Sequence, residues 1–323
     1  MNAQNTQTTQ TTQTIDIPER FRQLGVRHGF NPDDPDSLNL LIEALPGAGK
    51  TTFLMGIPDC LVLDFECAAN NVIAPRAAYV PIPTWKKYEE VKKELLEYSP
   101  VKLAGSKPPF KHIGFDTIDQ FLYLLDQHLC EEINAARAQR ADTRLLTTIK
   151  EYGSEGAGYV KLAEGMLREL HEFLQAGYTL KMTAHMKVRR QVVGDEVIEE
   201  KGSLAPPSIM QPLVRIVDVK ARLYRHIEDK YAIEEKEVVK EDGTRTKVRV
   251  TASKPTTVVS HYLGIFPQSA ADAADNDTKR RIPEMKVLIG IPLVHGYDAF
   301  KKAYMEAVEK AKQLESQAIS SKE

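Results

Sequence analysis

A glycine-rich turn near the start of the chain carries residue types that could bind a nucleoside triphosphate. The stretch "IEALPGAGKTTF" runs from Ile42 to Phe53 and joins an apolar run to a helix-like segment. Glycines in such a turn let backbone N–H groups point at phosphate oxygens, at the positive end of the next helix. Lys50 can reach the β- and γ-phosphates, and the Thr51 hydroxyl can coordinate Mg²⁺. The sequence predicts an ATP site with Mg²⁺ that is formed by Pro46, Gly47, Ala48, Gly49, Lys50, Thr51 and Thr52.

The first position of this motif departs from the usual pattern. Ala44 stands where such loops commonly have glycine. Alanine adopts the required loop conformation where φ is negative, so the expectation of a nucleotide site is unchanged. The alternative is a Gly-Lys-Thr sequence that occurs in a turn by chance.

Two acidic residues downstream lie where a metal ion and a water molecule would need them. Asp116 ends the run "HIGFD" and can hold Mg²⁺ through water, opposite Thr51. Glu66 ends the run "LVLDFE" and can polarise the water that attacks the γ-phosphate. Asp64 has the same strand parity as Glu66. The alternative is that acids simply end strands in solvent, and we expect this of Asp119 at the start of the next helix.

A histidine completes the set of candidate catalytic residues. His185 ends the run "TLKMTAH", and we expect it at a strand end beside the strand that carries Asp116. A polar side chain there can touch the γ-phosphate and report its presence to the segment that follows. The alternative is a structural histidine. Lys50, Glu66 and His185 are therefore the predicted catalytic residues.

The elements that position these residues alternate between strands and helices. Apolar runs typical of strands that are buried on both faces occur at Leu38–Ala44, Cys60–Glu66, Ala77–Ile82, Lys111–Thr117 and Tyr178–His185. Pro81 confines one of them to a sheet edge or a strand end. Helical spacing relates two further sets, with Gly177 as the C-cap after the second: Ile118, Phe121, Leu122, Leu125 and Leu129, then Val160, Met166, Leu167, Leu170, Phe173 and Leu174. This alternation predicts an α/β fold with a mainly parallel sheet.

The pattern changes after His185 to alternating polar and apolar residues. Residues 188–201 alternate around Gly194-Asp195, and residues 231–252 alternate around Asp242-Gly243, which predicts two antiparallel β-hairpins. A strand at "TTVVSHYLGIF" and an amphipathic C-terminal helix follow. We therefore expect a disordered tail at 1–14, a lead-in at 15–37, an ATPase domain at 38–290 with hairpin elaborations at 188–265, and a C-terminal helix and tail at 291–323.

Composition limits the classes of partner. The 323 residues carry a net charge of −2, so bulk charge alone does not predict a protein that coats nucleic acid. The three cysteines lack metal or redox spacing and fit a reducing cytoplasm, and the N-terminus lacks the parts of a signal peptide. No apolar run reaches the length of a membrane span. We expect a cytoplasmic protein without a membrane partner.

With these features in order, the chain resembles the RecA-like ATPases. More closely, it resembles the phage-encoded nucleotide-binding proteins of the Sak-type single-strand-annealing group, which are reduced RecA cores. The resemblance covers Leu38 to Ile289. The family's Gly-rich loop corresponds to Pro46–Thr52, and its water-activating glutamate to Glu66. Its Mg²⁺-associated aspartate corresponds to Asp116, and its polar sensor to His185. It implies a RecA-like P-loop NTPase core with antiparallel hairpin additions and a C-terminal helix.

The resemblance also implies basic residues that act across a subunit interface. The stretch "TKRRIPE" fits the family's basic pair before a proline, so Lys279 and Arg281 are candidates for contacts to a neighbour's γ-phosphate. The alternative is a solvated basic loop. DNA contacts in this fold come from loops that correspond to residues 137–158 and 187–207, where the basic candidates are Arg140, Arg144, Lys150, Lys187, Arg189 and Arg190. Tyr152 and Tyr159 are the aromatic candidates nearby.

The function implied by the resemblance is phage DNA recombination and repair. We expect ATP-dependent binding or annealing of single-stranded DNA in the bacterial host cytoplasm, by a ring or filament of this chain, beside a single-strand-binding protein. Two alternatives remain open. One is a helicase- or loader-type motor, and the other is a nucleotide-dependent protein-interaction module with little hydrolysis.

Overall fold

The structure is a computed structural model of the 323-residue chain. It describes residues 31–103, 106–139, 145–154, 156–193, 196–230, 233–239, 245–251, 256–265, 285, 288–292 and 294–320. The predicted disordered tail at 1–14 lies outside these residues, and so does the lead-in before residue 31. The turn residues of both predicted hairpins lie outside them as well.

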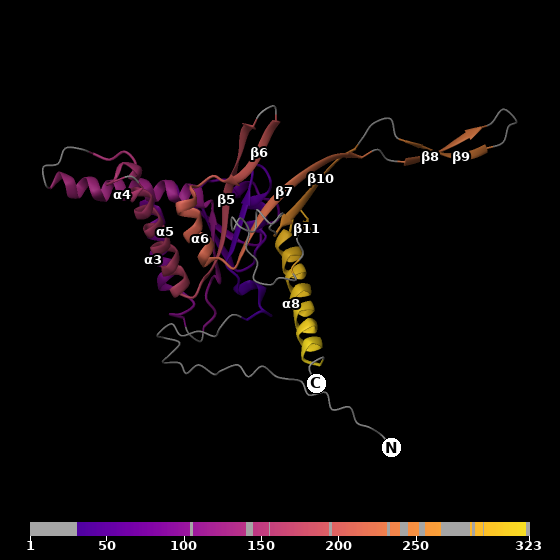
Figure 1. Ribbon diagram of the computed structural model, residues 1–323. Helices are drawn as coiled ribbons and strands as arrows, with labels where there is room; N and C mark the ends of the chain where they lie inside the picture. Colours follow the sequence, from indigo (N-terminus) through magenta and orange to yellow (C-terminus); the bar gives the residue numbers. More distant parts are fainter. Residues whose placement is uncertain are drawn as a thin grey trace, which may run out of the picture.

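A mainly parallel sheet forms the centre of the fold (Figure 1). Within the described residues, nine strands join in the order β11-β10-β7-β1-β5-β4-β2-β3, and β6 pairs with β5. The pairs from β7 through β1, β5, β4 and β2 to β3 are parallel, whereas β10 is antiparallel to both β7 and β11. The strands are β1 (Leu40–Ala44), β2 (Cys60–Asp64), β3 (Ala78–Pro81), β4 (His112–Asp116), β5 (Thr179–Val193), β6 (Glu196–Ser203), β7 (Val219–Lys230), β10 (Thr256–Gly264) and β11 (Leu288–Ile291).

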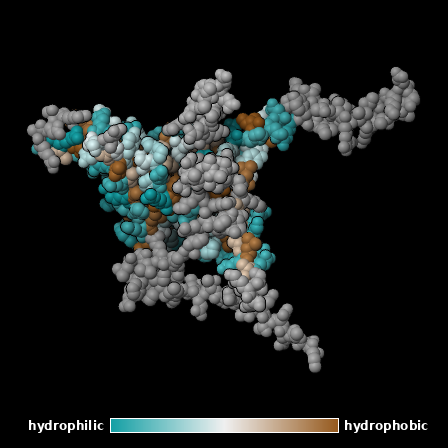
Figure 2. Space-filling view, in the orientation of Figure 1, coloured by the Kyte–Doolittle hydropathy of each residue, from teal (hydrophilic) through white to brown (hydrophobic). Residues whose placement is uncertain are grey.

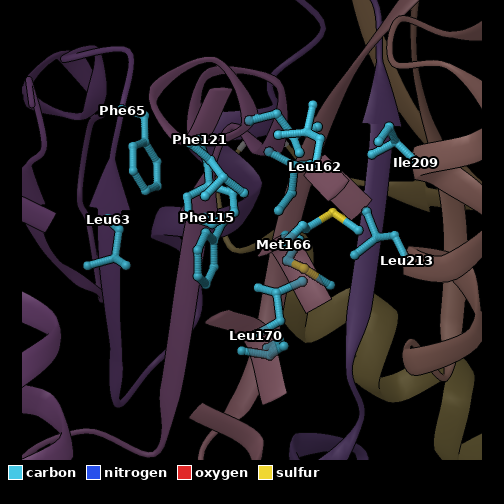
Figure 3. Packing of buried hydrophobic residues seen from close by; sticks show 14 of the residues in the cluster. Leu63, Phe65, Phe115, Phe121, Leu162, Met166, Leu170, Ile209 and Leu213 are labelled. Carbon is cyan, nitrogen blue, oxygen red and sulfur yellow. The ribbon is translucent and has the colours of Figure 1, made fainter. Parts of the chain in front are cut away.

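Helices cover both faces of this sheet. They are α2 (Lys50–Met55), α3 (Trp85–Glu97), α4 (Ile118–Ala138), α5 (Ala157–Gln175), α6 (Pro207–Ile216) and α8 (Gly296–Ser320). Side chains of β1 alternate between the faces, so Leu41 belongs to one apolar cluster and Leu40 and Ile42 to the other. The first cluster holds α3, α4, α5 and α6 against the sheet, with Phe115 and Met166 at its centre (Figure 3). The second holds α2 and α8. The predicted α/β class is confirmed.

The predicted helix faces are confirmed in α4 and, with one exception, in α5. All five apolar residues predicted for α4 are buried. In α5, Met166, Leu170 and Phe173 are buried, but Val160 is 56% exposed. Val160 precedes the buried Leu162 by two residues, which is about 200° around a helix, so its prediction as a core residue was wrong. None of the helices in the described ranges has both the length and the apolar character needed to cross a membrane.

Both antiparallel hairpins form. β5 pairs with β6 as far as Val193↔Glu196, and β8 (Ile233–Val239) pairs with β9 (Arg245–Thr251). The first hairpin is not a separate addition, because β5 continues without a break from the parallel sheet into it. The prediction that His185 ends a strand was therefore wrong. His185 instead lies where the pairing of β5 with β1 stops, opposite Ala44.

Candidate nucleotide-binding site

The predicted phosphate loop joins β1 to α2. Gly47 and Gly49 have φ angles of +75° and +97°, a backbone conformation that residues with a Cβ rarely adopt, so both positions require glycine. Lys50 begins α2, and its buried Nζ lies 3.4 Å from Ala44 O. Burial lowers the pKa of Lys50, while the nearby carboxylates of Glu66 and Asp116 oppose that shift. The lysine therefore reaches back across the loop to the backbone carbonyls of Ala44 and Leu45.

The Thr51 hydroxyl and the Asp116 carboxylate meet directly. Thr51 Oγ1 donates to Asp116 Oδ2 at 2.6 Å, and Thr183 Oγ1 of β5 donates to Asp116 Oδ1 at 2.5 Å. Asp116 is fully buried, and burial raises the pKa of its carboxyl above the usual range although both hydroxyls lower it. A carboxylate beside a hydroxyl at the end of a phosphate loop is an oxygen donor set that suits Mg²⁺. The residues present thus fit the ion expected with ATP.

Glu66 lies beside this pair at the same end of the sheet. Its Oε1 accepts a hydrogen bond from Thr117 Oγ1 at 3.0 Å and lies 3.4 Å from His185 Nδ1. The residue is exposed, so water can reach its carboxylate. Two neighbours, Thr117 at the start of α4 and His185 on β5, therefore hold Glu66 in one position while it faces solvent.

Asp119 contradicts the expectation of a solvated acid at a helix start. Its side chain is only 10% exposed, and Oδ2 accepts a hydrogen bond from the His185 backbone N–H at 2.6 Å. The same oxygen lies 3.5 Å from His185 Nδ1. The first turn of α4 faces β5 across β4, so this carboxylate turns inward and fixes the histidine instead of facing water.

Asp64 and Glu66 turn to different partners. Asp64 is buried, and its carboxylate accepts the backbone N–H groups of Ala68 and Ala69 at 3.2 and 2.9 Å. It therefore holds the turn that follows Glu66. Parallel pairing explains why the acids gather, because Asp64 of β2 lies opposite Asp116 of β4, and β1 and β5 end their pairing at the same edge.

Sequence reasoning missed Thr117, Thr183 and Asp119. Thr117 directly follows Asp116 in "FDT", so a hydroxyl next to a strand-end carboxylate was visible in the sequence. Thr183 lies two residues before His185 and so shares its face of β5, but nothing in the sequence tells that Thr183 contacts Asp116. Asp119 looked like an ordinary acid of a first helical turn.

The residues predicted to contact DNA divide into described and undescribed positions. Lys150 is exposed in the short helix η3 (Ile149–Glu151), and its Nζ lies 5.8 Å from the centre of the Tyr159 ring. Lys161 Nζ lies 5.5 Å from the centre of the Tyr152 ring, and Tyr152 and Tyr159 are partly buried against the first apolar cluster. Lys187 Nζ donates to Leu204 O at 3.1 Å. Arg189 and Arg190 lie on β5, while Arg140, Arg144, Lys279 and Arg281 lie outside the described residues.

The comparison with protein families agrees with this geometry. A family model described as an AAA domain matches residues 37–258, which is more than two thirds of the chain and includes the phosphate loop, Glu66, Asp116 and His185. No curated protein sequence matches the chain. An AAA domain indicates a nucleotide-binding ATPase with a P-loop core, and ATP is typically bound with Mg²⁺ in such a domain. By the extent of this match and the site it contains, the chain belongs to the AAA domain family.

Proposed function

We propose that the protein hydrolyses ATP and couples hydrolysis to the binding or annealing of single-stranded DNA in phage recombination. The observation that carries this proposal is the continuity of β5. The strand passes Thr183 and His185 at the nucleotide site and runs directly into the β5–β6 hairpin, which carries Lys187, Arg189 and Arg190. A change at the γ-phosphate can therefore reach a basic surface along one element.

The geometry supports hydrolysis with Glu66 as the general base. Its carboxylate is exposed to water and is held by Thr117 and His185, which is what positioning an attacking water requires. Lys50 supplies positive charge where charge builds up on the phosphoryl oxygens. Bound Mg²⁺ would neutralise phosphate charge, with Thr51 and Asp116 as its protein partners. A module with little hydrolysis would not need an exposed carboxylate fixed by two neighbours.

The lysine and tyrosine side chains of the α4–α5 connection support single-stranded DNA as the partner. Tyrosine rings can stack on bases of any sequence, and lysines beside them can contact the phosphates between those bases. Lys150 lies over the Tyr159 ring and Lys161 over the Tyr152 ring, so each tyrosine has a lysine beside it. A ring or filament, with Lys279 and Arg281 acting on a neighbour's nucleotide, remains part of the proposal.

Steady-state ATP turnover with and without a single-stranded oligonucleotide tests the proposal. Wild type, Lys50→Ala and Lys279→Ala/Arg281→Ala are compared in the same assay. We expect DNA to stimulate wild-type turnover, and we expect both variants to lose that stimulation. Lys50→Ala also reports whether turnover comes from this site.

Two outcomes would redirect the proposal. Turnover that ignores DNA would remove the main support for annealing and direct attention to protein partners. Separation of duplex strands that depends on hydrolysis would favour the motor alternative over annealing.

A further inference from the structure

The long helix α4 contacts the nucleotide site at its first turn. Asp119 lies in that turn, and its Oδ2 accepts the backbone N–H of His185 at 2.6 Å. Thr117, the residue before the helix, donates to Glu66 Oε1 at 3.0 Å. Both neighbours that hold Glu66 therefore depend on where α4 begins, Thr117 directly and His185 through Asp119.

Asp119 and Glu66 face the same nitrogen of His185. Glu66 Oε1 lies 3.4 Å from His185 Nδ1, and Asp119 Oδ2 lies 3.5 Å from it. Carboxylates accept hydrogen bonds, so Nδ1 must carry the hydrogen that both oxygens face. One N–H cannot serve two acceptors fully. A shift of Asp119 toward the ring or away from it therefore changes how firmly His185 holds Glu66.

The same helix also holds the α4–α5 connection. Asp126 Oδ1 accepts the Ile149 backbone N–H at 2.5 Å, and its Oδ2 accepts the Thr148 hydroxyl at 2.9 Å. Further along α4, Asn134 exchanges two hydrogen bonds with the backbone of Leu146, at 2.8 and 2.9 Å. Leu146 and Ile149 are buried as well, so this part of the connection is fastened to α4.

The segment fastened in this way lies next to proposed DNA contacts. Lys150, which follows Ile149, is exposed, and Leu145 before the segment is 60% exposed. Figure 2 shows hydrophilic and hydrophobic residues side by side on the lobe around α4, at the left of the view. Single-stranded DNA bound there would act on the residues that Asp126 holds.

The part of α4 between the two contacts is suited to move as one piece. Asp119 and Asp126 are seven residues apart, which is about 10 Å along a helix. The sequence between them has no glycine or proline that would favour a kink. Phe121 and Leu125 of this stretch are buried in the first apolar cluster. A displacement at Asp126 is therefore passed along the helix to Asp119 with little loss by bending.

We infer that Asp119 is a positioning residue of the hydrolytic reaction and that α4 places it under the control of the α4–α5 connection. DNA on the connection shifts α4 through Asp126, and Asp119 then changes the hold of His185 on Glu66. The inference rests on the proposed function. It adds a route from DNA to the general base that does not pass through the β5–β6 hairpin.

Steady-state ATP turnover of the full chain, with and without a saturating single-stranded oligonucleotide, tests this route. The ratio of the two kcat values is compared for wild type, Asp119→Asn, Asp126→Asn and Thr148→Val. Fluorescence anisotropy without nucleotide gives the oligonucleotide affinity of each protein. We expect a wild-type ratio above about fivefold, the lower end of common coupling between two sites.

The variants at the two ends of the route should differ in basal turnover. Asp126→Asn and Thr148→Val should keep the basal kcat and the oligonucleotide affinity of wild type, while their ratio falls toward one. Asp119→Asn should lose the ratio as well and should also lower the basal kcat. Its KM for ATP should stay unchanged, because Asp119 acts on the hold of Glu66 and not on the phosphates.

A double variant and a control on the same helix complete the design. Asp119→Asn/Asp126→Asn should show the same ratio as either single variant, because the two residues act in series. Glu131→Gln replaces an exposed acid of α4 and should keep both the basal kcat and the ratio of wild type.

Several results would overturn the inference. A wild-type ratio in Asp126→Asn and Thr148→Val, or in Asp119→Asn, would show that the stimulation does not pass through α4. A lost ratio that is matched by lost oligonucleotide affinity would make Asp126 only a support of the DNA surface. Thr148→Val keeps the size of the side chain, so it tests the route even if Asp126→Asn fails to fold. Wild-type turnover that ignores the oligonucleotide would refute the proposed coupling to DNA and this route together.

Discussion

Glu66 Oε1 lies 3.4 Å from His185 Nδ1, so the carboxylate that faces the water side of the site touches the strand that leads to the basic hairpin. Thr117 holds the same oxygen from the strand end beside it, and Asp119 holds the backbone of His185. A movement of Glu66 on nucleotide binding or release would therefore displace His185 and, with it, β5. Under the proposed function, this contact would link hydrolysis to the β5–β6 hairpin.

The buried Asp116 carboxylate is expected to lower the stability of the ligand-free protein. Because burial raises the pKa of its carboxyl, the folded protein without ligand holds this charge at a cost that an amide avoids. Asp116→Asn should raise the melting temperature of the ligand-free protein by about 2–4 °C. It should also abolish the part of ATP-induced stabilisation that depends on Mg²⁺. Thermal unfolding with and without Mg²⁺ and ATP measures both effects.

Asp126→Asn is a suitable control for that experiment. Asp126 accepts hydrogen bonds from the Ile149 backbone and from Thr148, so its variant should lower the melting temperature and leave Mg²⁺-dependent stabilisation intact. A lower melting temperature for Asp116→Asn would show that the carboxylate stabilises the ligand-free fold, contrary to this account.

Lys181 predicts a specific pH dependence of stability. It is fully buried, its Nζ donates to the carbonyls of Asp36 and Leu38, and burial lowers its pKa from 10.5 to about 8. Between these two values the unfolded chain binds more protons than the folded one, so Lys181 makes stability rise as the pH rises through this window. The rise can reach about 3 kcal/mol.

Urea unfolding between pH 8 and 10.5 measures this slope. Lys181→Met should flatten it relative to wild type, whereas Lys102→Met, at an exposed site, should keep it. Comparison at each pH cancels the other groups that titrate in the same window. An unchanged slope in Lys181→Met would show that the lysine stays protonated inside the fold.

The buried pair Glu43 and Lys220 should be strongly coupled. Lys220 Nζ lies 3.2 Å from Glu43 Oε2 of β1, both residues are buried, and the Ser203 hydroxyl also donates to Glu43. Glu43→Leu or Lys220→Met alone leaves a buried charge and should lower the free energy of unfolding by about 3–5 kcal/mol. The double variant should lose less than the sum of the two. Additive losses in urea unfolding would show that the two charges act independently.

Much of the fold could be predicted because its signals are local. The runs at β1, β2 and β4 are mainly apolar and buried on both faces, and β2 and β4 end at an aspartate, so their position within the chain is plain. Pro81 marks the edge strand β3 for a simple steric reason, since it cannot donate a hydrogen bond to a further strand. The phosphate loop was predicted from its glycines, whose positive φ angles few other residues tolerate.

The rest depends on contacts between distant segments. β7 was not predicted because Lys220 and Arg222 are charged but buried, and Lys220 pairs with Glu43 of the distant strand β1. In the sequence Asp119 looks like a solvated acid, because its partner, the backbone N–H of His185, comes from the distant strand β5. Such pairings have no signature in any one segment.

The tyrosine and lysine surface of the α4–α5 connection predicts graded effects on DNA affinity. Tyr152→Ala and Tyr159→Ala should each weaken binding of a single-stranded oligonucleotide by about 1–3 kcal/mol, the value of one stacked base. Lys161→Ala should weaken binding and reduce its salt dependence, because it removes a phosphate contact. Fluorescence anisotropy at several salt concentrations measures both.

Tyr123→Ala provides the matched control, because Tyr123 is 56% exposed on α4 and its hydroxyl engages Gln127 of the same helix. It should bind the oligonucleotide like wild type. Equal affinity of wild type and the Tyr152 and Tyr159 variants would exclude this surface as the DNA site.

The most direct test of the site is ATP turnover by Glu66→Gln, measured beside its affinity for ATP with Mg²⁺. Glutamine keeps the size and the hydrogen bond to Thr117 but cannot accept a proton from water. The account predicts that turnover falls about 10²- to 10⁴-fold while ATP affinity stays close to that of wild type. Turnover equal to that of wild type would contradict the assignment of Glu66 as the general base and, with it, the proposed link from hydrolysis through His185 to the hairpin.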